Sequence, residues 1–202
     1  MLLTVLFLLV AGNSAFWRAA LAGRDWGQPS TVGLAAAMFV GFCGFFFAFG
    51  ALISTRHTVK PLLTVLLLVS AAAAYYIDRY AIYFDPAMLR NVLATDYKEA
   101  RELLGWGLAQ HLLVFGVVPS MLVWWPRLKR RPLGRAVAAR LGWIALALAL
   151  GVGSLLLVFA DFASLMRNKK EIRYLLTPGN VVVAAVSNGW GQARHTGKPK
   201  LP

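Results

Sequence analysis

The sequence predicts an all-α integral membrane protein, on the evidence of its composition and of five long apolar runs. Of the 202 residues, 59% are hydrophobic and only 14% are charged, which is unlike a soluble domain. Each run has about 20 residues, the length of helix that crosses a hydrocarbon core about 30 Å thick. The runs are residues 1–21, 31–53, 61–81, 105–125 and 141–160. We therefore expect five transmembrane helices, with short amphipathic helices after the third and fifth spans.

Two of the five runs are less uniform than the others. The fourth is interrupted by Gln110, His111 and Pro119, but it closes on Trp124–Trp125, and tryptophan is enriched at membrane interfaces. The first lies at the extreme amino terminus, where the small residues of AGNSAF would suit a signal-peptide cleavage site. Because this run lacks a basic start and is long for a signal peptide, we favour an uncleaved first span, with a cleaved leader as the alternative.

Charge asymmetry predicts how the spans are oriented. The loop between spans two and three contains Arg56 and Lys60, and the loop between spans four and five contains six basic residues; neither loop contains an acidic residue. The positive-inside rule places both loops in the cytoplasm. The loop after span three has charges of both signs, including Arg90, Asp85 and Glu102, so we expect it on the far side. This predicts an amino terminus inside and a carboxy terminus outside.

The sequence contains no self-sufficient active site. His57, His111 and His195 fall in separate regions under this topology, and the single cysteine, Cys43, lies in an apolar run, so neither a metal site nor a disulfide framework is predicted. Glycine-rich phosphate loops and GxSxG elbows are absent from the sequence. The basic loops explain most of the net charge of +13 as contacts with an anionic leaflet, so no nucleic-acid partner is implied.

The cluster GFCGFFFAFG at 41–50 predicts helix packing rather than a ligand site. Small residues let helices approach closely in lipid, although Gly41, Gly44 and Gly50 do not follow the GxxxG spacing.

The polar stretch YFDPAMLRNVLATDYKEARELL, residues 83–104, predicts two short helices at the membrane boundary. Asp85 followed by Pro86 is typical of a helix start, with the carboxylate as N-cap and proline at the first helical position. Asp96 and Glu99 resemble a capping box for a second helix. The apolar positions recur at helical spacing, which favours amphipathic helices with their apolar faces toward lipid.

Asn91, Thr95 and Glu99 lie four residues apart in this stretch, so a continuous helix would place them on one face. An amide, a hydroxyl and a carboxylate together could hold a polar head group. Spacing alone nevertheless favours structural roles: Thr95 in a turn, Glu99 as a capping partner and Asn91 simply solvated.

A second polar segment follows the last span. Apolar residues between 162 and 175 recur near helical spacing, and the opposite side is basic through Arg167, Lys169, Lys170 and Arg173. This pattern predicts an amphipathic surface helix able to meet lipid phosphates. TPGN at 177–180 should end that helix, since proline and glycine break helices.

These two polar segments, the second being MRNKKEIRYLLTPGN, resemble the membrane domain of the bacterial lipid A phosphoethanolamine transferases. The resemblance implies a multi-pass protein of the bacterial inner membrane, with residues 1–160 as the five-span domain that includes periplasmic helices 85–104. Residues 161–190 would be periplasmic interfacial helices, and 191–202 a truncated linker toward a catalytic domain.

The implied reaction moves phosphoethanolamine from phosphatidylethanolamine to a lipid A phosphate, which weakens binding of cationic peptides such as polymyxin. The family's nucleophilic threonine and zinc ligands belong to the periplasmic catalytic domain, so we expect no catalytic residue, metal or cofactor in this chain. The family's head-group residues match Asn91, Thr95 and Glu99, and Arg167, Lys169, Lys170 and Arg173 become candidates for contacting lipid phosphate.

A competing interpretation is a free-standing five-span protein that binds lipid or a partner and has no catalytic activity. A transporter is less well supported, because the spans lack charges near the middle of the membrane and paired broken helices.

Overall fold

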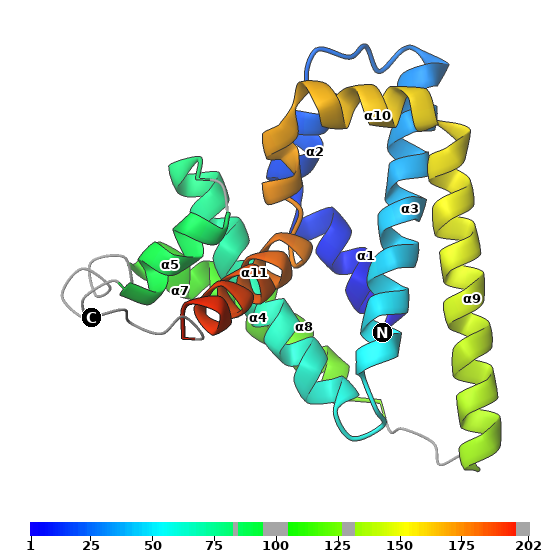
Figure 1. Cartoon of the computed structure of the whole chain (residues 1–202), viewed down its shortest axis with the longest axis vertical. Helices are drawn as coiled ribbons and strands as arrows, with labels where there is room; N and C mark the ends of the chain where they lie inside the picture. The colour runs from blue at the N-terminus through cyan, green and yellow to red at the C-terminus, as the bar shows by residue number, and fades with distance from the viewer. Residues whose placement is uncertain (83–84, 95–104, 127–131, 197–202) are drawn as a thin grey trace.

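The computed structural model describes residues 1–82, 85–94, 105–126 and 132–196, and within these ranges every regular element is a helix (Figure 1). Four helical segments are long and apolar enough to cross a membrane. They are α3 (Pro29–Ile53), α4 (Val59–Tyr80), the run Trp106–Trp124 and α9, whose apolar part is Gly134–Leu157. The predicted helical, multi-span architecture is therefore confirmed, with the first run as the element that departs from it.

The first predicted span is two helices rather than one. Helix α1 (Leu2–Ala11) and helix α2 (Ser14–Leu21) meet at an angle of 59°, so five spans result only if the bent pair counts as one. Asn13 lies at the bend and is 1% exposed. Its Nδ2 donates to the carbonyl oxygen of Leu8 at 2.7 Å, which is consistent with a bend because that carbonyl gains a side-chain donor.

The fourth and fifth spans also depart from the predicted bounds. Span four consists of α7 (Trp106–Leu112), a π-helical turn η1 (Leu113–Val117) and α8 (Val118–Trp124). Helix α9 (Leu133–Leu157) begins eight residues before the predicted start at 141. The prediction placed the start too late because Arg135 and Arg140 lower the hydropathy of this stretch without disfavouring a helix.

Two charged side chains near span ends have partners in the protein. The Arg140 guanidinium, on α9, donates to the carbonyl oxygens of Ala51 and Ser54 at the end of α3, where a cation complements the unpaired carbonyls of a helix terminus. Near the end of α4, Asp78 forms an ion pair with Arg18 of α2. Both contacts join helices that are distant in sequence.

Helices α3 and α9 run side by side (Figure 1), and glycines set their close approach. A Cβ added at Gly44 would lie 2.4 Å from the carbonyl oxygen of Ala147 and 3.0 Å from the Cα of Gly151. A Cβ at Gly41 would lie 2.7 Å from the Cγ of Leu155. The predicted packing role of the glycine cluster is thus confirmed, although two of its glycines stand three residues apart rather than four.

The buried core lies where α2, α3 and α4 meet the segments that follow α9. Phe16 of α2, Leu34 and Met38 of α3, and Leu165 and Ile172 of the later segments belong to one buried cluster. These contacts place the polar segment after the last span against the membrane helices.

The segment after α9 is not the single helix that the sequence predicts. Helix α10 (Phe159–Asn168) ends before Lys169, a 3-10 turn η2 (Lys170–Tyr174) follows, and α11 (Gly179–Thr196) begins within TPGN. The break occurs where Lys169 has an irregular backbone, with φ −127° and ψ 68°. Helix α11 also continues to Thr196, past the predicted start of the linker at 191. That these helices lie on the periplasmic surface stays a prediction.

Candidate functional site

The two polar motifs, separated by about sixty residues in sequence, lie together in the structure. Helix α5 (Pro86–Ala94) comes from the first motif, and α11 begins in the second; the two helices pack against each other at one side of the molecule (Figure 1). The predicted start of α5 is confirmed, because the Oδ1 atom of Asp85 accepts the N–H of Met88 at 2.7 Å and Pro86 occupies the first helical position.

Asn188 of α11 holds the two helices in register. Its Nδ2 donates to the carbonyl oxygen of Pro86 at 3.0 Å, and its Oδ1 accepts from the Nη1 of Arg90 at 3.0 Å. Pro86 and Arg90 stand four residues apart and so share one face of α5. The contact between Arg90 and Asn188 is hard to predict from the sequence, because both side chains look like those of ordinary surface residues.

A pocket of about 440 Å³ opens beside this contact. Its polar lining consists of Arg173, Tyr174, Asn180 and Ser187, and its apolar lining includes Pro86 and Val183. This volume falls within the range of small-molecule sites, and an apolar wall with a few polar groups is typical of such sites. An amphiphile with a charged head group fits that chemistry.

Arg173 supplies the positive charge of the pocket. Its side chain is exposed, its Nη2 donates to the Tyr174 hydroxyl at 2.9 Å, and its guanidinium carbon lies 4.8 Å from the Tyr174 ring centroid. Within the described ranges no carboxylate forms an ion pair with Arg173. A guanidinium has five N–H donors in a planar fork, so Arg173 retains donors for a phosphate.

Asn180 shapes the pocket wall and is itself 4% exposed. Its Nδ2 donates to the carbonyl oxygen of Tyr174 at 2.7 Å, and its Oδ1 accepts the N–H of Val181 at 2.7 Å. The side chain therefore links η2 to the first turn of α11.

Hydrogen bonds from Asn13, at the bend in the first span, hold the backbone of Thr177, which lies between the pocket residues Leu176 and Gly179. Thr177, which is 0% exposed, donates its backbone N–H to the Oδ1 of Asn13 at 2.7 Å, and its carbonyl oxygen accepts from the Nδ2 of Asn13 at 2.8 Å. The Thr177 hydroxyl donates to the carbonyl oxygen of Gly12 at 2.9 Å. Asn13 was not predicted as a site residue, yet an amide in the middle of an apolar run is itself a signal.

The structure places only one of the three predicted head-group residues. Asn91 is exposed on α5, about 100° around the helix from Arg90, and does not line the pocket. Thr95 and Glu99 lie outside the described residues. The convergence of the three side chains therefore stays a prediction.

The four basic residues of the second motif do not form one exposed basic face. Arg167 and Lys170 are exposed, whereas the Nζ of Lys169 donates to the carbonyl oxygens of Ala19 at 2.8 Å and Ala22 at 3.3 Å. Lys169 thus caps the end of α2 and keeps at most one N–H for a lipid phosphate. Arg173 is the member of the set that lines the pocket.

The family model described as phosphoethanolamine transferase EptA/EptB matches residues 41–192. Phosphatidylethanolamine transferase Mcr-2 of Escherichia coli is 28% identical over 176 residues, covering 87% of this chain and 32% of that protein. Phosphoethanolamine transferase EptA of Escherichia coli K12 is 31% identical over 144 residues, covering 71% of this chain and 26% of that protein.

A solved structure agrees with both matches. The lipooligosaccharide phosphoethanolamine transferase A of Neisseria meningitidis, an integral membrane protein, superposes with a TM-score of 0.86 at 25% identity, over 98% of this chain and 37% of that one. The chain thus spans 26% to 37% of the length of these three relatives. It is a multi-pass membrane protein, and it belongs to the phosphoethanolamine transferase EptA/EptB family, whose amino-terminal membrane domain it represents.

Proposed function

We propose that this chain is the membrane domain of an enzyme that transfers phosphoethanolamine from phosphatidylethanolamine to a lipid A phosphate in the bacterial inner membrane. In this role it anchors a periplasmic catalytic domain and presents lipid head groups to it. The observation that carries the proposal is the pocket between η2 and α11, where Arg173 faces an apolar wall without an ion-pair partner in the described ranges. Phosphoryl transfer depends on positioned charge, and a fixed guanidinium supplies it.

The donor lipid fits this pocket by its chemistry. The phosphate of phosphatidylethanolamine would accept N–H donors from Arg173, while its glycerol and upper acyl carbons would lie along Leu176 and Val183. We propose that Asn91 and Thr95 contact the same head group and that Glu99 pairs with its ammonium. Arg167 and Lys170, which are exposed, would attract phosphorylated lipid A.

The reaction itself requires groups that the described residues do not provide. No three His, Cys, Asp or Glu side chains among residues 1–82, 85–94, 105–126 and 132–196 lie close enough to hold a metal ion. We propose that the zinc implied by the family is bound by the catalytic domain, and no step of the proposal passes through a metal in this chain.

Donor binding can be measured on this chain in nanodiscs by native mass spectrometry with added phosphatidylethanolamine. Arg173→Gln should weaken retention about tenfold, the effect of losing one charge-assisted hydrogen bond of about 1.4 kcal/mol, and Arg173→Lys should recover part of it. Arg167→Gln removes an equal charge outside the pocket and should change retention little. Equal loss in the two glutamine variants would mean that general basicity, not the pocket, binds the lipid.

The role of the head-group site in catalysis must be tested on the gene product as the cell makes it. An intact mass well above 22.1 kDa would identify a longer polypeptide, in which Glu99→Ala should lower lipid A modification without lowering membrane abundance. A native product of 22.1 kDa with no catalytic partner would instead support the free-standing lipid-binding interpretation, which the family match does not favour.

A further inference from the structure

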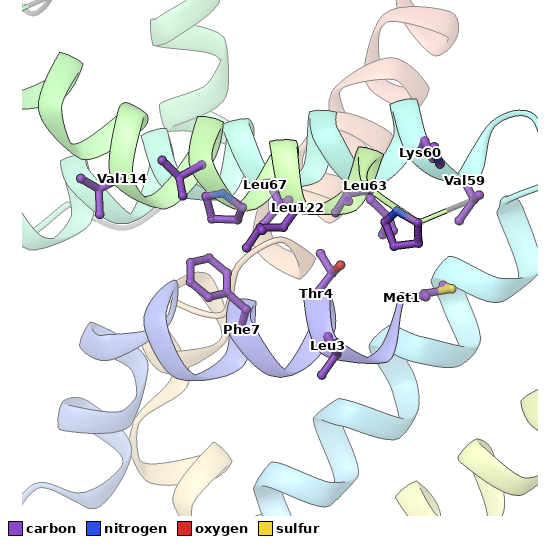
Figure 2. Close-up of a pocket in the computed structure, with 14 residues that line it drawn as sticks. Met1, Leu3, Thr4, Phe7, Val59, Lys60, Leu63, Leu67, Val114 and Leu122 are labelled. Atoms are coloured by element: carbon purple, nitrogen blue, oxygen red, sulfur yellow. The ribbon is translucent and has the colours of Figure 1, made fainter. Parts of the chain in front are cut away.

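A second cavity lies away from the candidate head-group pocket, along α1, α4 and span four. It is a groove of about 500 Å³ with an apolar lining. Figure 2 shows Phe7 and Thr4 projecting from α1 toward Val114, Leu67 and Leu122 on the facing helices. The proposed function does not use this groove.

The groove has an apolar end and a charged end. Near Val114 the rings of Phe7 and Phe115 approach with centroids 6.4 Å apart. At the other end lie Val59 and Lys60 (Figure 2), next to Trp124, whose ring suits the membrane interface. The groove therefore changes from apolar to cationic along its length, which complements a lipid that changes from hydrocarbon to an anionic phosphate.

Its length matches one leaflet. Within the helices of span four the lining runs from Val114 to Val123, and nine residues of helix rise about 14 Å. Half of a hydrocarbon core about 30 Å thick is about 15 Å. An acyl chain lying in the groove would thus end near the middle of the bilayer while its head group reached Lys60.

Lys60 is held at the mouth and keeps free donors. Its Nζ donates to the carbonyl oxygen of Trp124 at 2.9 Å and lies 5.5 Å from the Trp124 ring centroid. The Nε1 of Trp124 in turn donates to the Thr64 hydroxyl at 3.0 Å. An ammonium has three N–H donors, and no carboxylate in the described ranges pairs with Lys60.

The surrounding charge selects the kind of lipid. The described segments 54–60 and 132–140, which the positive-inside rule places on the same side of the membrane, contain four basic residues and no acidic one. Such a mouth attracts an anionic head group, whereas the ammonium of a zwitterionic lipid finds no carboxylate in either segment. We propose that the groove binds one acyl chain of an anionic phospholipid whose phosphate is held by Lys60. This site is separate from the proposed donor pocket, and its occupant is not the donor.

The site can be tested by photo-crosslinking the chain in nanodiscs. Phosphatidylglycerol with a diazirine near the methyl end of one acyl chain is added at low proportion, and the labelled peptides are mapped by mass spectrometry. Labels should concentrate on Phe7 and Val114, and excess unlabelled phosphatidylglycerol should remove them. Exposed Leu150 and Leu157 of α9, 57% and 87% exposed, report ordinary surrounding lipid and should be labelled without such competition.

Point variants distinguish a lipid bound specifically in the groove from one in transient contact with it. Lys60→Gln should lower groove labelling about fivefold, the effect of one lysine near an anionic surface, and Lys60→Arg should restore it. Val118→Trp should block the groove, while Leu150→Trp on α9 should not. Labelling that is uniform and uncompeted, or that phosphatidylethanolamine competes as well as phosphatidylglycerol, would overturn the proposal without affecting the Arg173 pocket.

Discussion

Replacing Asn13 with alanine tests the buried network that joins the bend of the first span to Thr177. The Asn13 side chain accepts the Thr177 N–H at 2.7 Å and donates to the carbonyl oxygens of Thr177 and Leu8 at 2.8 and 2.7 Å. After truncation the Leu8 carbonyl keeps the N–H of Gly12, at 3.0 Å. Both backbone groups of Thr177, by contrast, lose the partner that Asn13 provides.

The expected cost follows from those two groups. A buried backbone group without a partner costs about 1–3 kcal/mol, so the pair should cost about 2–6 kcal/mol. Thr177→Val is the matched control, because it leaves both backbone bonds to Asn13 intact and removes only the hydroxyl, for about 1 kcal/mol. Asn13→Ala should therefore destabilise the segment around Thr177 at least about twice as much as Thr177→Val does.

Hydrogen exchange of the chain in nanodiscs, read by mass spectrometry, measures the effect where it occurs. Because local opening exposes only the detached segment, the amides of Thr177 and of residues 179–182 should exchange at least about 30-fold faster in Asn13→Ala, the factor that corresponds to 2 kcal/mol. Amides of α9 should be unchanged. Equal exchange in the Asn13→Ala and Thr177→Val proteins would refute the reasoning, because it would mean that the paired backbone groups contribute no more than the hydroxyl.

Three further variants test individual contacts. Gly44→Ala places a Cβ against the backbone of α9 and should cost about 1–3 kcal/mol of thermal stability in detergent, whereas Gly153→Ala, with open space around it, should be neutral or slightly stabilising. Arg140→Gln removes the cation from the end of α3 and should cost up to about 2 kcal/mol, measured in the same melts; an unchanged melting temperature would mean that water replaces the guanidinium. Asn188→Ala removes two hydrogen bonds to α5 and should raise exchange at Pro86–Ala94 without lowering the melting temperature of the bundle; unchanged exchange would show that apolar contacts alone hold α5.

Local patterns predicted the parts of this fold that depend on neighbouring residues. Apolar runs located the spans because burial in lipid requires continuous helix. The Asp85–Pro86 pair located the start of α5 because capping acts within one turn. The glycine cluster at 41–50 indicated close helix packing, but the sequence could not name α9 as the partner, since its Gly151 stands about a hundred residues away.

Contacts between distant residues could not be predicted in this way. Asn13 and Thr177 are 164 residues apart, and the sequence predicted AGNSAF only as part of an uncleaved span or as a cleavage site, neither of which points to Thr177. Lys169 looked like part of a basic surface because its helical spacing fitted, and only the position of α2 shows that its ammonium meets the carbonyl oxygens of Ala19 and Ala22. In both cases the side chain donates to a backbone carbonyl oxygen of a segment that is distant in the sequence.

The same contacts connect the first span to the candidate head-group pocket. Thr177 lies four residues after Arg173 and three before Asn180, and both of these line the pocket. If Asn13 fixes Thr177, it also fixes the backbone on either side of the pocket, although it touches no lining residue itself. Asn13→Ala should therefore weaken phosphatidylethanolamine retention while leaving the groove at Lys60 fully labelled by phosphatidylglycerol. Loss at both sites would indicate general unfolding, and loss at neither would show that the pocket keeps its shape without the bend.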